Sequence, residues 1–452
     1  QPERSFQKIM NKNKDYLITE KPSRALFAFA LPMIIGNLFQ QAYTIVDSAI
    51  VGHYVGETAL AAVGASYALT SIFICVAIGG GIGASVIISQ HFGGHAYSRM
   101  KNSIRTAMLS FLLISLLLGG IGLCFSRQIM EALNTPADAM DIAVIYLNIY
   151  FYGLPFLFMY NILSSMFNAL GESRIPLYLL IFSSVLNIFL DLYMVATLHL
   201  GVAGAAYATF IAQGISAVCS FLIFLRTLRR LDGKAETWFS KAEFSSMSRI
   251  ALPSILQQST VSIGMMLVQS VVNGFGTQIL AGFSAGMRIE SLCVVPMSAI
   301  GNALSSYAAQ NIGAEKHERI PLGYRAANIM VAITAVILCL FLELLHRPLI
   351  ALFLDGAPSA QTVATGEGYL RFIGFFFCGR RHSSRCRSRK SFYHRQSGKP
   401  GAACAHCQAR SSCLRHCHDM VRRAAGMARK LPDLLRILPD REMETDIISM
   451  NT

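Results

Sequence analysis

Long apolar segments alternate with short polar segments along most of the chain. Each apolar segment has about 18 or more mostly apolar residues, enough for a helix to cross a hydrocarbon layer of about 30 Å. The pattern predicts an all-α polytopic membrane protein with nine complete spans and the start of a tenth near residue 361. The complete spans are expected near residues 25–49, 59–88, 103–125, 139–166, 175–197, 202–225, 247–274, 279–307 and 326–346.

The composition supports a membrane location. Hydrophobic residues make up 53% of the chain and charged residues 14%, whereas soluble domains carry about 25% charged residues. The mean hydropathy is +0.47. The first 24 residues are polar and basic, so we expect no cleavable signal peptide before the first span. These features predict a multi-pass protein of the plasma or inner cell membrane, and not a soluble enzyme.

Basic residues in the loops predict the orientation, because Lys and Arg are retained on the cytoplasmic side of a membrane. Residues 1–378 contain 23 Lys and Arg residues, and 19 of them lie in alternate loops, beginning with residues 1–24. The opposite loops hold only Arg127 and Arg347. The N-terminus is therefore expected to be cytoplasmic.

An internal repeat organises the spans. The chain from Phe29 reads FALPMIIGNLFQQAYTIVDSAIVG, and it recurs loosely from Ile250 as IALPSILQQSTVSIGMMLVQSVVNG. Matching residues are about 220 positions apart, as with Gln90 and Gln310. Six spans lie in one period, so the two repeats run in the same direction and are related by an axis along the membrane normal. Two parallel lobes of six helices each, with 12 spans in all, are expected.

Residues 379–452 differ in character from the rest of the chain. They hold 16 Lys and Arg against 6 Asp and Glu, and so supply +10 of the formal net charge of +14. Codons can be chosen for residues 391–401 and for residues 418–439 so that the next reading frame encodes apolar helical sequence. We therefore interpret residues 379–452 as an irregular tail translated out of frame after a shift near codons 378–382.

The predicted organisation has five parts. The tail truncates the second lobe, so that only about nine and a half of the expected spans are present. The parts are a cytoplasmic N-terminal segment (1–24), an N-lobe with spans 1 to 6 (25–228), a cytoplasmic linker (229–246), a truncated C-lobe with spans 7 to 10 (247–378) and the out-of-frame tail (379–452).

The tail also raises a different class of function, a membrane-tethered protein that binds zinc or nucleic acid. Cys404, Cys407, Cys413 and Cys417 have something of the spacing of a structural zinc site, and the positive charge would suit a nucleic acid. Only five residues separate the two Cys pairs, and no periodic apolar face accompanies them. We therefore expect neither a zinc site nor nucleic-acid binding.

Two acidic residues lie within the predicted spans of the N-lobe, Asp47 in the first and Asp191 in the fifth. A charged group inside a bilayer costs about 2.5 to 3.5 kcal/mol on insertion scales, so an acid there is paired, faces a wet cavity or is protonated. Both acids lie toward the outer ends of their spans, which predicts a similar depth. Asn187 lies one turn before Asp191 on the same helix face. A solvated helix end is the alternative interpretation for each acid.

Several stretches resemble the multidrug and toxic compound extrusion (MATE) transporters. The resemblance covers residues 24–378 and rests on the ALP that opens each lobe and on LFQQAYTIVDSAIVG, SQHFGGHAYSR, FNALGESRIP, LNIFLDLYMV and LGVAGAAYATFIAQ. It implies a monomeric antiporter that exports organic cations and other amphiphiles in exchange for protons or sodium ions, through a cavity that opens alternately to the two sides of the bilayer. The alternative within the same superfamily is a lipid-linked oligosaccharide flippase, whose members resemble these motifs less closely.

The resemblance also implies site residues. Asp47, Asn187, Asp191 and Thr209 match positions that form a proton or sodium site in related proteins, and no other metal or cofactor is expected. Some relatives place a second acid in the first helix of the C-lobe, where this chain has glutamines, so ion coupling is assigned to the N-lobe. The candidates for the substrate cavity are Gln40, Gln41, Tyr43, Gln257, Gln258, Arg288 and Glu290.

Two further patterns have ordinary interpretations. The sequence GGGIGAS at residues 79–85 partly imitates a dinucleotide-binding loop, but it lies inside a span with no strand before it. Small residues there predict a close approach between helices. His53, His91 and His95 are interpreted as loop residues without a special role.

The interpretation of the tail generates the first test. Resequencing the gene across codons 370–390 should reveal a shifted frame, and the chain as it stands should be inactive in transport because its C-lobe is incomplete. A single uninterrupted frame, or drug export by this chain at the level of a frame-corrected version, would contradict the interpretation.

Overall fold

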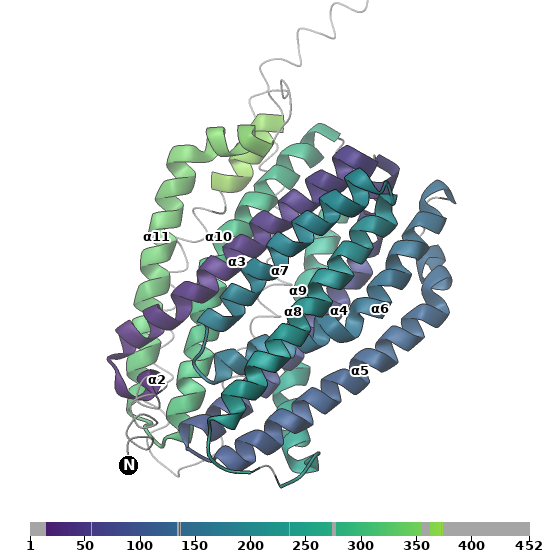
Figure 1. Cartoon of the computed structure of the whole chain (residues 1–452). Helices are drawn as coiled ribbons and strands as arrows, with labels where there is room; N and C mark the ends of the chain where they lie inside the picture. The colour runs from purple at the N-terminus through teal and green to yellow at the C-terminus, as the bar shows by residue number, and fades with distance from the viewer. Residues whose placement is uncertain are drawn as a thin grey trace, which may run out of the picture.

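The computed structural model describes residues 15–55, 57–132, 135, 137–234, 236–273, 277–353, 362–371 and 373. These residues form a bundle of long helices, and none of them forms a strand (Figure 1). The elements are α2 (Tyr16–Thr19), α3 (Pro22–Val55), α4 (Glu57–Gly93), α5 (Tyr97–Ala132), α6 (Ala137–Ala169), α7 (Arg174–Asp191), the π-helical η1 (Leu192–Thr197), α8 (Gly201–Arg229), α9 (Lys241–Asn273), α10 (Thr277–Gly313) and α11 (Arg319–Phe353).

The described residues contain nine helices that are long and apolar enough to cross a membrane. Each one overlaps one of the nine complete spans expected from the hydropathy pattern, so that prediction is confirmed. Residues 362–371 are helical as well, where the tenth span was expected to begin. The interpretation of residues 379–452, including the four cysteines considered for zinc, lies outside the described residues.

The helices form two lobes whose contacts mirror each other. The N-lobe contains α3 to α8, and the C-lobe contains α9 to α11 in the part that the structure describes. Across the joint, α4 packs against α9, while α10 packs against α3. In each lobe, the second helix therefore packs against the first helix of the other lobe. Such reciprocal packing is what a parallel two-fold repeat requires.

Glycines let the backbones of the two lobes come very close at one end of the joint. A Cβ atom on Gly93 would lie 2.0 Å from the carbonyl oxygen of Gln310, and a Cβ atom on Gly313 would lie 1.8 Å from the carbonyl oxygen of Gln90. These four residues are the repeat partners, each pair separated by 220 positions. The contact therefore lies at the repeat axis, and only glycine fits there.

The glycine-rich stretch of α4 makes the same kind of contact farther along the joint. A Cβ atom on Gly79 would lie 2.6 Å from the backbone nitrogen of Ile255, and one on Gly83 would lie 2.7 Å from the side chain of Ala251. Both partners belong to α9 in the C-lobe. This confirms that the small residues at 79–85 serve helix packing.

The short helix α2 closes one end of the bundle by contacting both lobes. The hydroxyl of Tyr16 donates to the carbonyl oxygen of Gly171 in the N-lobe at 3.0 Å. The carbonyl oxygen of Leu17 accepts from the side chain of Asn311 in the C-lobe at 3.1 Å, and that of Ile18 accepts from Lys316 at 3.0 Å. We call this end of the molecule the α2 end; it lies at the foot of Figure 1.

Part of the N-terminal segment is thus buried, although its composition predicted a polar extension. Leu17 has no exposed surface, and Ile18 is 4% exposed. They pack in an apolar cluster with residues of α3, α10 and α11, including Phe29 and Tyr307. Two apolar residues in an otherwise charged segment are enough to hold α2 against the joint between the lobes.

The reciprocal glycine contact generates the second prediction. Gly93→Ala and Gly313→Ala should each destabilise the protein by roughly 1 to 3 kcal/mol, because the added methyl group forces two backbones apart. Thermal unfolding in detergent measures the effect. Gly301→Ala, in α10 with no other atom within 4 Å of the added Cβ, is the matched control and should be neutral. Equal melting temperatures for all three variants would contradict the prediction.

Candidate functional site

Two carboxyl groups meet inside the N-lobe. Asp47 lies on α3 and is half-buried, while Asp191 is the last residue of α7 and has no exposed surface. The two side chains lie within hydrogen-bonding reach of each other. Two carboxyl groups can form such a bond only when they share a proton, because an ionised carboxylate has no donor.

Asn187 connects this pair to Tyr43 and to the backbone of Thr209. It lies one turn before Asp191 on α7 and is 2% exposed. With its amide nitrogen toward Asp191, Asn187 donates to Asp191 Oδ2 at 2.9 Å and to the hydroxyl oxygen of Tyr43 at 2.7 Å, while its amide oxygen accepts from the backbone N–H of Thr209 at 3.0 Å. This orientation satisfies all three neighbours and is the one that the hydrogen-bond network selects.

The chain changes its helical geometry next to Asp191. The α-helix α7 ends there, and the π-helical segment η1 follows directly. His199 and Gly201 then adopt positive φ angles of 53° and 59°, which turn the chain into α8. Departures from α-helical geometry of this kind often occur at functional sites. Here the turn brings Thr209 of α8 back beside Asn187 of α7.

A cleft adjoins the site. Its lining between α6 and α8 includes Tyr146, Tyr150, Thr209 and Gln213. Thr209 belongs both to this lining and to the hydrogen-bonded group around Asn187. The cleft therefore adjoins the hydrogen-bonded group at Thr209.

One oxygen of each carboxyl group is left without a partner. Within the described part of the chain, Asp47 Oδ1 and Asp191 Oδ1 are both buried and receive no hydrogen bond. Buried oxygens of this kind are unfavourable unless a proton or a cation neutralises them. Carboxylate, amide and hydroxyl oxygens are also the donors that a hard cation prefers. The group can therefore hold a proton, and its chemistry also fits a sodium ion.

The structure brings together all four residues expected at the ion site and adds Tyr43 to them. Tyr43 was assigned to the substrate cavity, but its hydroxyl lies at Asn187. In the sequence, Tyr43 lies four residues before Asp47. This spacing of about one helical turn could have indicated that the two side chains lie on the same face of α3. Tyr146 was not expected near the acids either, and it lies in the cleft beside Thr209.

The other candidates for the substrate cavity do not form one group with Tyr43. Gln40 and Arg288 are exposed, while Gln41, Gln257 and Gln258 are half-buried on the first helices of the two lobes. Glu290 lies inside the C-lobe, where its carboxylate accepts a hydrogen bond from Tyr369 of the helix at residues 362–371. A role of these residues in substrate binding stays a prediction.

One sequence interpretation is wrong. His91 was taken as a loop residue, but it lies in the last turn of α4, and its Nε2 atom is 3.1 Å from Glu243 Oε2 at the start of α9. Ser103 of α5 donates to the same carboxylate oxygen at 2.8 Å. The histidine is part of a polar link between the lobes, and its distant partner left no signal in the local sequence.

Comparison with known proteins assigns the chain to a family. The MatE family model matches residues 32–193 and 253–380. The probable multidrug resistance protein YpnP of Bacillus subtilis is 31% identical over 78% of this chain and 79% of its own length. The chain belongs to the MatE family.

Two proteins with lower sequence identity match this chain over a similar share of its length. A FAD transporter of Shewanella oneidensis is 23% identical over 81% of this chain and 79% of its own length. A MOP superfamily transporter from Pyrococcus furiosus superposes with a TM-score of 0.75 at 23% identity, over 80% of this chain and 81% of its own. The fold is therefore that of a MATE transporter, and the chain is a multi-pass membrane transporter.

The hydrogen bonds of Asn187 generate the third prediction. Asn187→Ala removes the donor to Asp191 and leaves buried oxygens unpaired, which should destabilise the protein by about 1 to 3 kcal/mol. Asn328→Ala is the matched control, because that exposed asparagine donates to a carbonyl oxygen of its own helix and its loss should be nearly neutral. Thermal unfolding in detergent compares the two, and an equal effect would show that the buried network contributes nothing.

Proposed function

We propose that the protein exports small cationic or amphiphilic molecules by antiport, coupled to the inward movement of protons or sodium ions. The observation that supports this most directly is the pair of Asp47 and Asp191, whose Oδ1 atoms are both buried and receive no hydrogen bond in the described part of the chain. A shared proton or a bound cation would neutralise such a pair. Relatives named as a probable multidrug resistance protein and a multidrug export protein support the substrate class. We further propose that the protein acts as a monomer.

The proposed coupling follows from the repulsion between two carboxylates. Without a bound ion, two negative charges would face each other in a medium of low dielectric constant, where the repulsion is much larger than in water. A proton or a sodium ion removes this repulsion and lets α3 and α7 pack closely. An ion can shift a conformational equilibrium only by binding one state better than another. The state with the paired acids is the state that binds the ion.

Helix α3 provides a path from this site to the other lobe. Asp47 lies on α3, which packs against α7 and α8 within the N-lobe and against α10 and α11 of the C-lobe. A change in how α3 packs on α7 therefore also changes the surface that it presents to the C-lobe. We infer that binding of the ion alters the joint between the lobes by this route.

The contacts at the α2 end support an assignment of the conformational state. Both lobes are joined there by α2 and by the reciprocal glycine contact. If the N-terminus is cytoplasmic, as the distribution of basic residues predicts, this end is closed toward the cytoplasm. We therefore interpret the structure as a state that faces outward and receives the coupling ion from outside.

The functional form of the protein is proposed to continue in a different frame after about residue 378. The MatE match ends at residue 380, close to the position where the composition changes. Transport is therefore best measured with a frame-corrected gene, in parallel with the present chain.

The fourth prediction tests the coupling. In vesicles with an imposed proton or sodium gradient, Asp191→Asn and Asp47→Asn should each abolish gradient-driven export of a cationic dye. Asparagine fits the same space and still forms hydrogen bonds, so folding should be nearly intact. Asp141→Asn is the control, because that carboxylate is 82% exposed and paired with Arg127; its transport should equal that of the wild type. Wild-type rates in both site variants would place the coupling elsewhere, with Glu290 as the next candidate.

A further inference from the structure

The linker between the lobes is fixed to the beginning of α5. The ammonium group of Lys101 donates to the carbonyl oxygen of Leu231 at 2.7 Å and to that of Gly233 at 2.8 Å. Gly233 has a φ angle of +83°, and a Cβ atom there would lie 2.9 Å from the hydroxyl oxygen of Ser98. The first half of the linker therefore follows the surface of α5 closely.

The second half of the linker is held by the next turn of the same helix. The side-chain oxygen of Asn102 accepts from the backbone N–H groups of Glu236 at 3.0 Å and Thr237 at 3.3 Å. The hydroxyl oxygen of Thr106 accepts from the backbone N–H of Ser240 at 3.0 Å. A cytoplasmic linker was expected over residues 229–246, but α9 already begins at Lys241, and residues 230–234 and 236–240 form a strap on the N-lobe.

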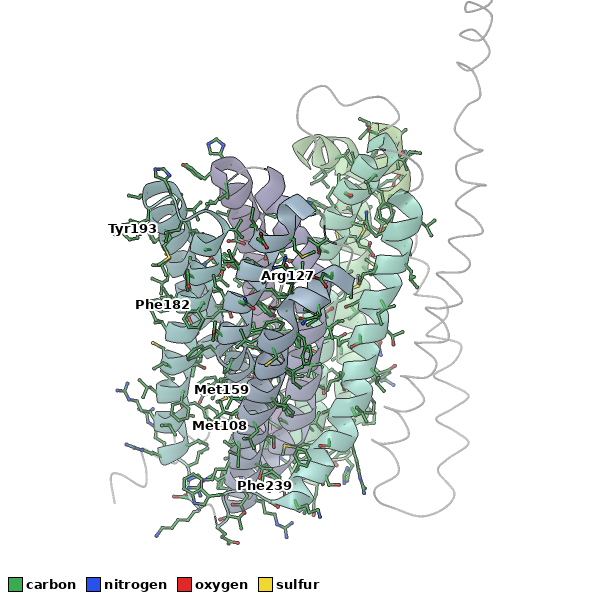
Figure 2. The ribbon with its side chains drawn as sticks, turned by 90° about the vertical axis from the view of Figure 1, so that its right-hand side faces the viewer. Met108, Arg127, Met159, Phe182, Tyr193 and Phe239 are labelled. Carbon is green, nitrogen blue, oxygen red and sulfur yellow. The ribbon has the colours of Figure 1, made fainter. Side chains whose placement is uncertain are left out.

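This strap presents aromatic side chains to the outside. Trp238 is 79% exposed, and the guanidinium carbon of Arg105 lies 4.9 Å from the centre of its ring. Phe239 is 44% exposed, and Figure 2 shows it near the foot of the bundle. Its ring packs against that of Phe244, which lies in the first turn of α9 and is 37% exposed, with the ring centres 5.7 Å apart. Fixed, exposed aromatic rings of this kind are typical of contact surfaces.

The strap lies at the depth where the apolar surface of the bundle ends. On each adjoining helix, an arginine lies about one turn from an exposed leucine, on the side toward the strap. This spacing corresponds to about 6 Å along the helix axis. Arginine and aromatic side chains are enriched at this level, where hydrocarbon meets the lipid headgroups. The pairs are Arg105 with Leu109 on α5, Arg226 with Leu222 on α8, and Arg249 with Leu252 on α9.

Positive charge surrounds the exposed rings. Exposed basic residues outnumber exposed acidic residues in the strap and at the adjoining ends of α5, α8 and α9. The acidic residues are Asp232 and Glu236. Glu243 does not add free negative charge to this surface, because it contacts His91 and Ser103. The exposed basic residues are Arg99, Arg226, Arg229, Arg230, Lys234, Lys241 and Arg249.

We propose that this linker surface, formed by residues 230–234 and 236–240 with the exposed basic residues of α5, α8 and α9, binds the headgroups of anionic bilayer lipids. The arginines supply charge complementary to a lipid phosphate, and Trp238 supplies a ring suited to the boundary between headgroup and hydrocarbon. The surface extends directly from the lipid-facing spans, so a lipid headgroup reaches it without leaving the bilayer.

Bound lipid would act on the connection between the lobes. The strap leads directly into α9, whose Glu243 is held by Ser103 of α5 and His91 of α4. A lipid that neutralises the basic residues stabilises the strap on α5 and thereby fixes the start of the C-lobe relative to the N-lobe. The inference concerns a different part of the molecule from the carboxyl pair and does not depend on which ion is coupled.

Trp238 is the sole tryptophan of the chain, so its fluorescence reports on this surface alone. The full chain in neutral detergent is titrated with mixed micelles that contain either phosphatidylglycerol or phosphatidylcholine. We expect phosphatidylglycerol to shift the emission of Trp238 to shorter wavelength and to protect it from acrylamide. Arg226→Gln should weaken the association with phosphatidylglycerol about fivefold, because one basic residue near an anionic surface contributes about that factor.

Arg325→Gln is the matched control. Arg325 is the repeat partner of Arg105, is exposed, and also lies one turn before an exposed apolar residue, Ile329, but it lies on α11, away from the strap. Its loss should leave the titration of Trp238 unchanged. The proposal is overturned if the two lipids give the same response, or if Arg325→Gln weakens the response as much as Arg226→Gln.

A measurement on the unaltered chain covers the case in which a variant fails to fold. Raising the salt concentration to about 1 M shortens the screening length to about 3 Å. The preference of Trp238 for phosphatidylglycerol over phosphatidylcholine should then disappear. A preference that persists unchanged at high salt would also overturn the proposal, because charge would not be its cause.

Discussion

The burial of two acidic side chains within a membrane-spanning lobe is the constraint on which the proposed mechanism depends. Asp191 has no exposed surface, and its partner Asp47 is half-buried on a different helix. Asn187 donates to one oxygen of Asp191, but one oxygen on each acid has no donor in the described part of the chain. We propose that a proton or a cation completes this site, which forms where α3, α7 and α8 converge.

The two-fold repeat gives this local constraint a wider effect. Because α3 packs against helices of both lobes, we propose that a change in its packing at Asp47 is transmitted to α10 and α11. At the α2 end the backbones of α4 and α10 touch at Gly93 and Gly313, so that contact is either formed completely or broken. A joint that closes through rigid backbone contacts favours two discrete arrangements over a continuous range.

The spans, the repeat, Asp47, Asp191 and Asn187 could be predicted from local signals in the sequence, whereas Thr209 was predicted only from the family resemblance. Apolar length indicates a span, and an acid within a span is unusual enough to attract attention. The contact of Tyr43 with Asn187 was not predicted, because the face of α3 that meets α7 depends on packing between helices. The contact of His91 with Glu243 spans 152 positions, and no local pattern marks it. Leu17 and Ile18 show the same limit, since two apolar residues in a charged segment do not reveal what they pack against.

The central claim is that the pair of Asp47 and Asp191 holds the coupling ion and releases it when substrate binds. Ion release can be measured directly in the frame-corrected protein, by adding a cationic substrate in weakly buffered detergent solution with a pH-sensitive dye, and in parallel after equilibration with radioactive sodium. The account predicts release of a proton or a sodium ion on substrate binding in the wild type and its loss in Asp191→Asn. Equal release from the wild type and from Asp191→Asn would contradict it.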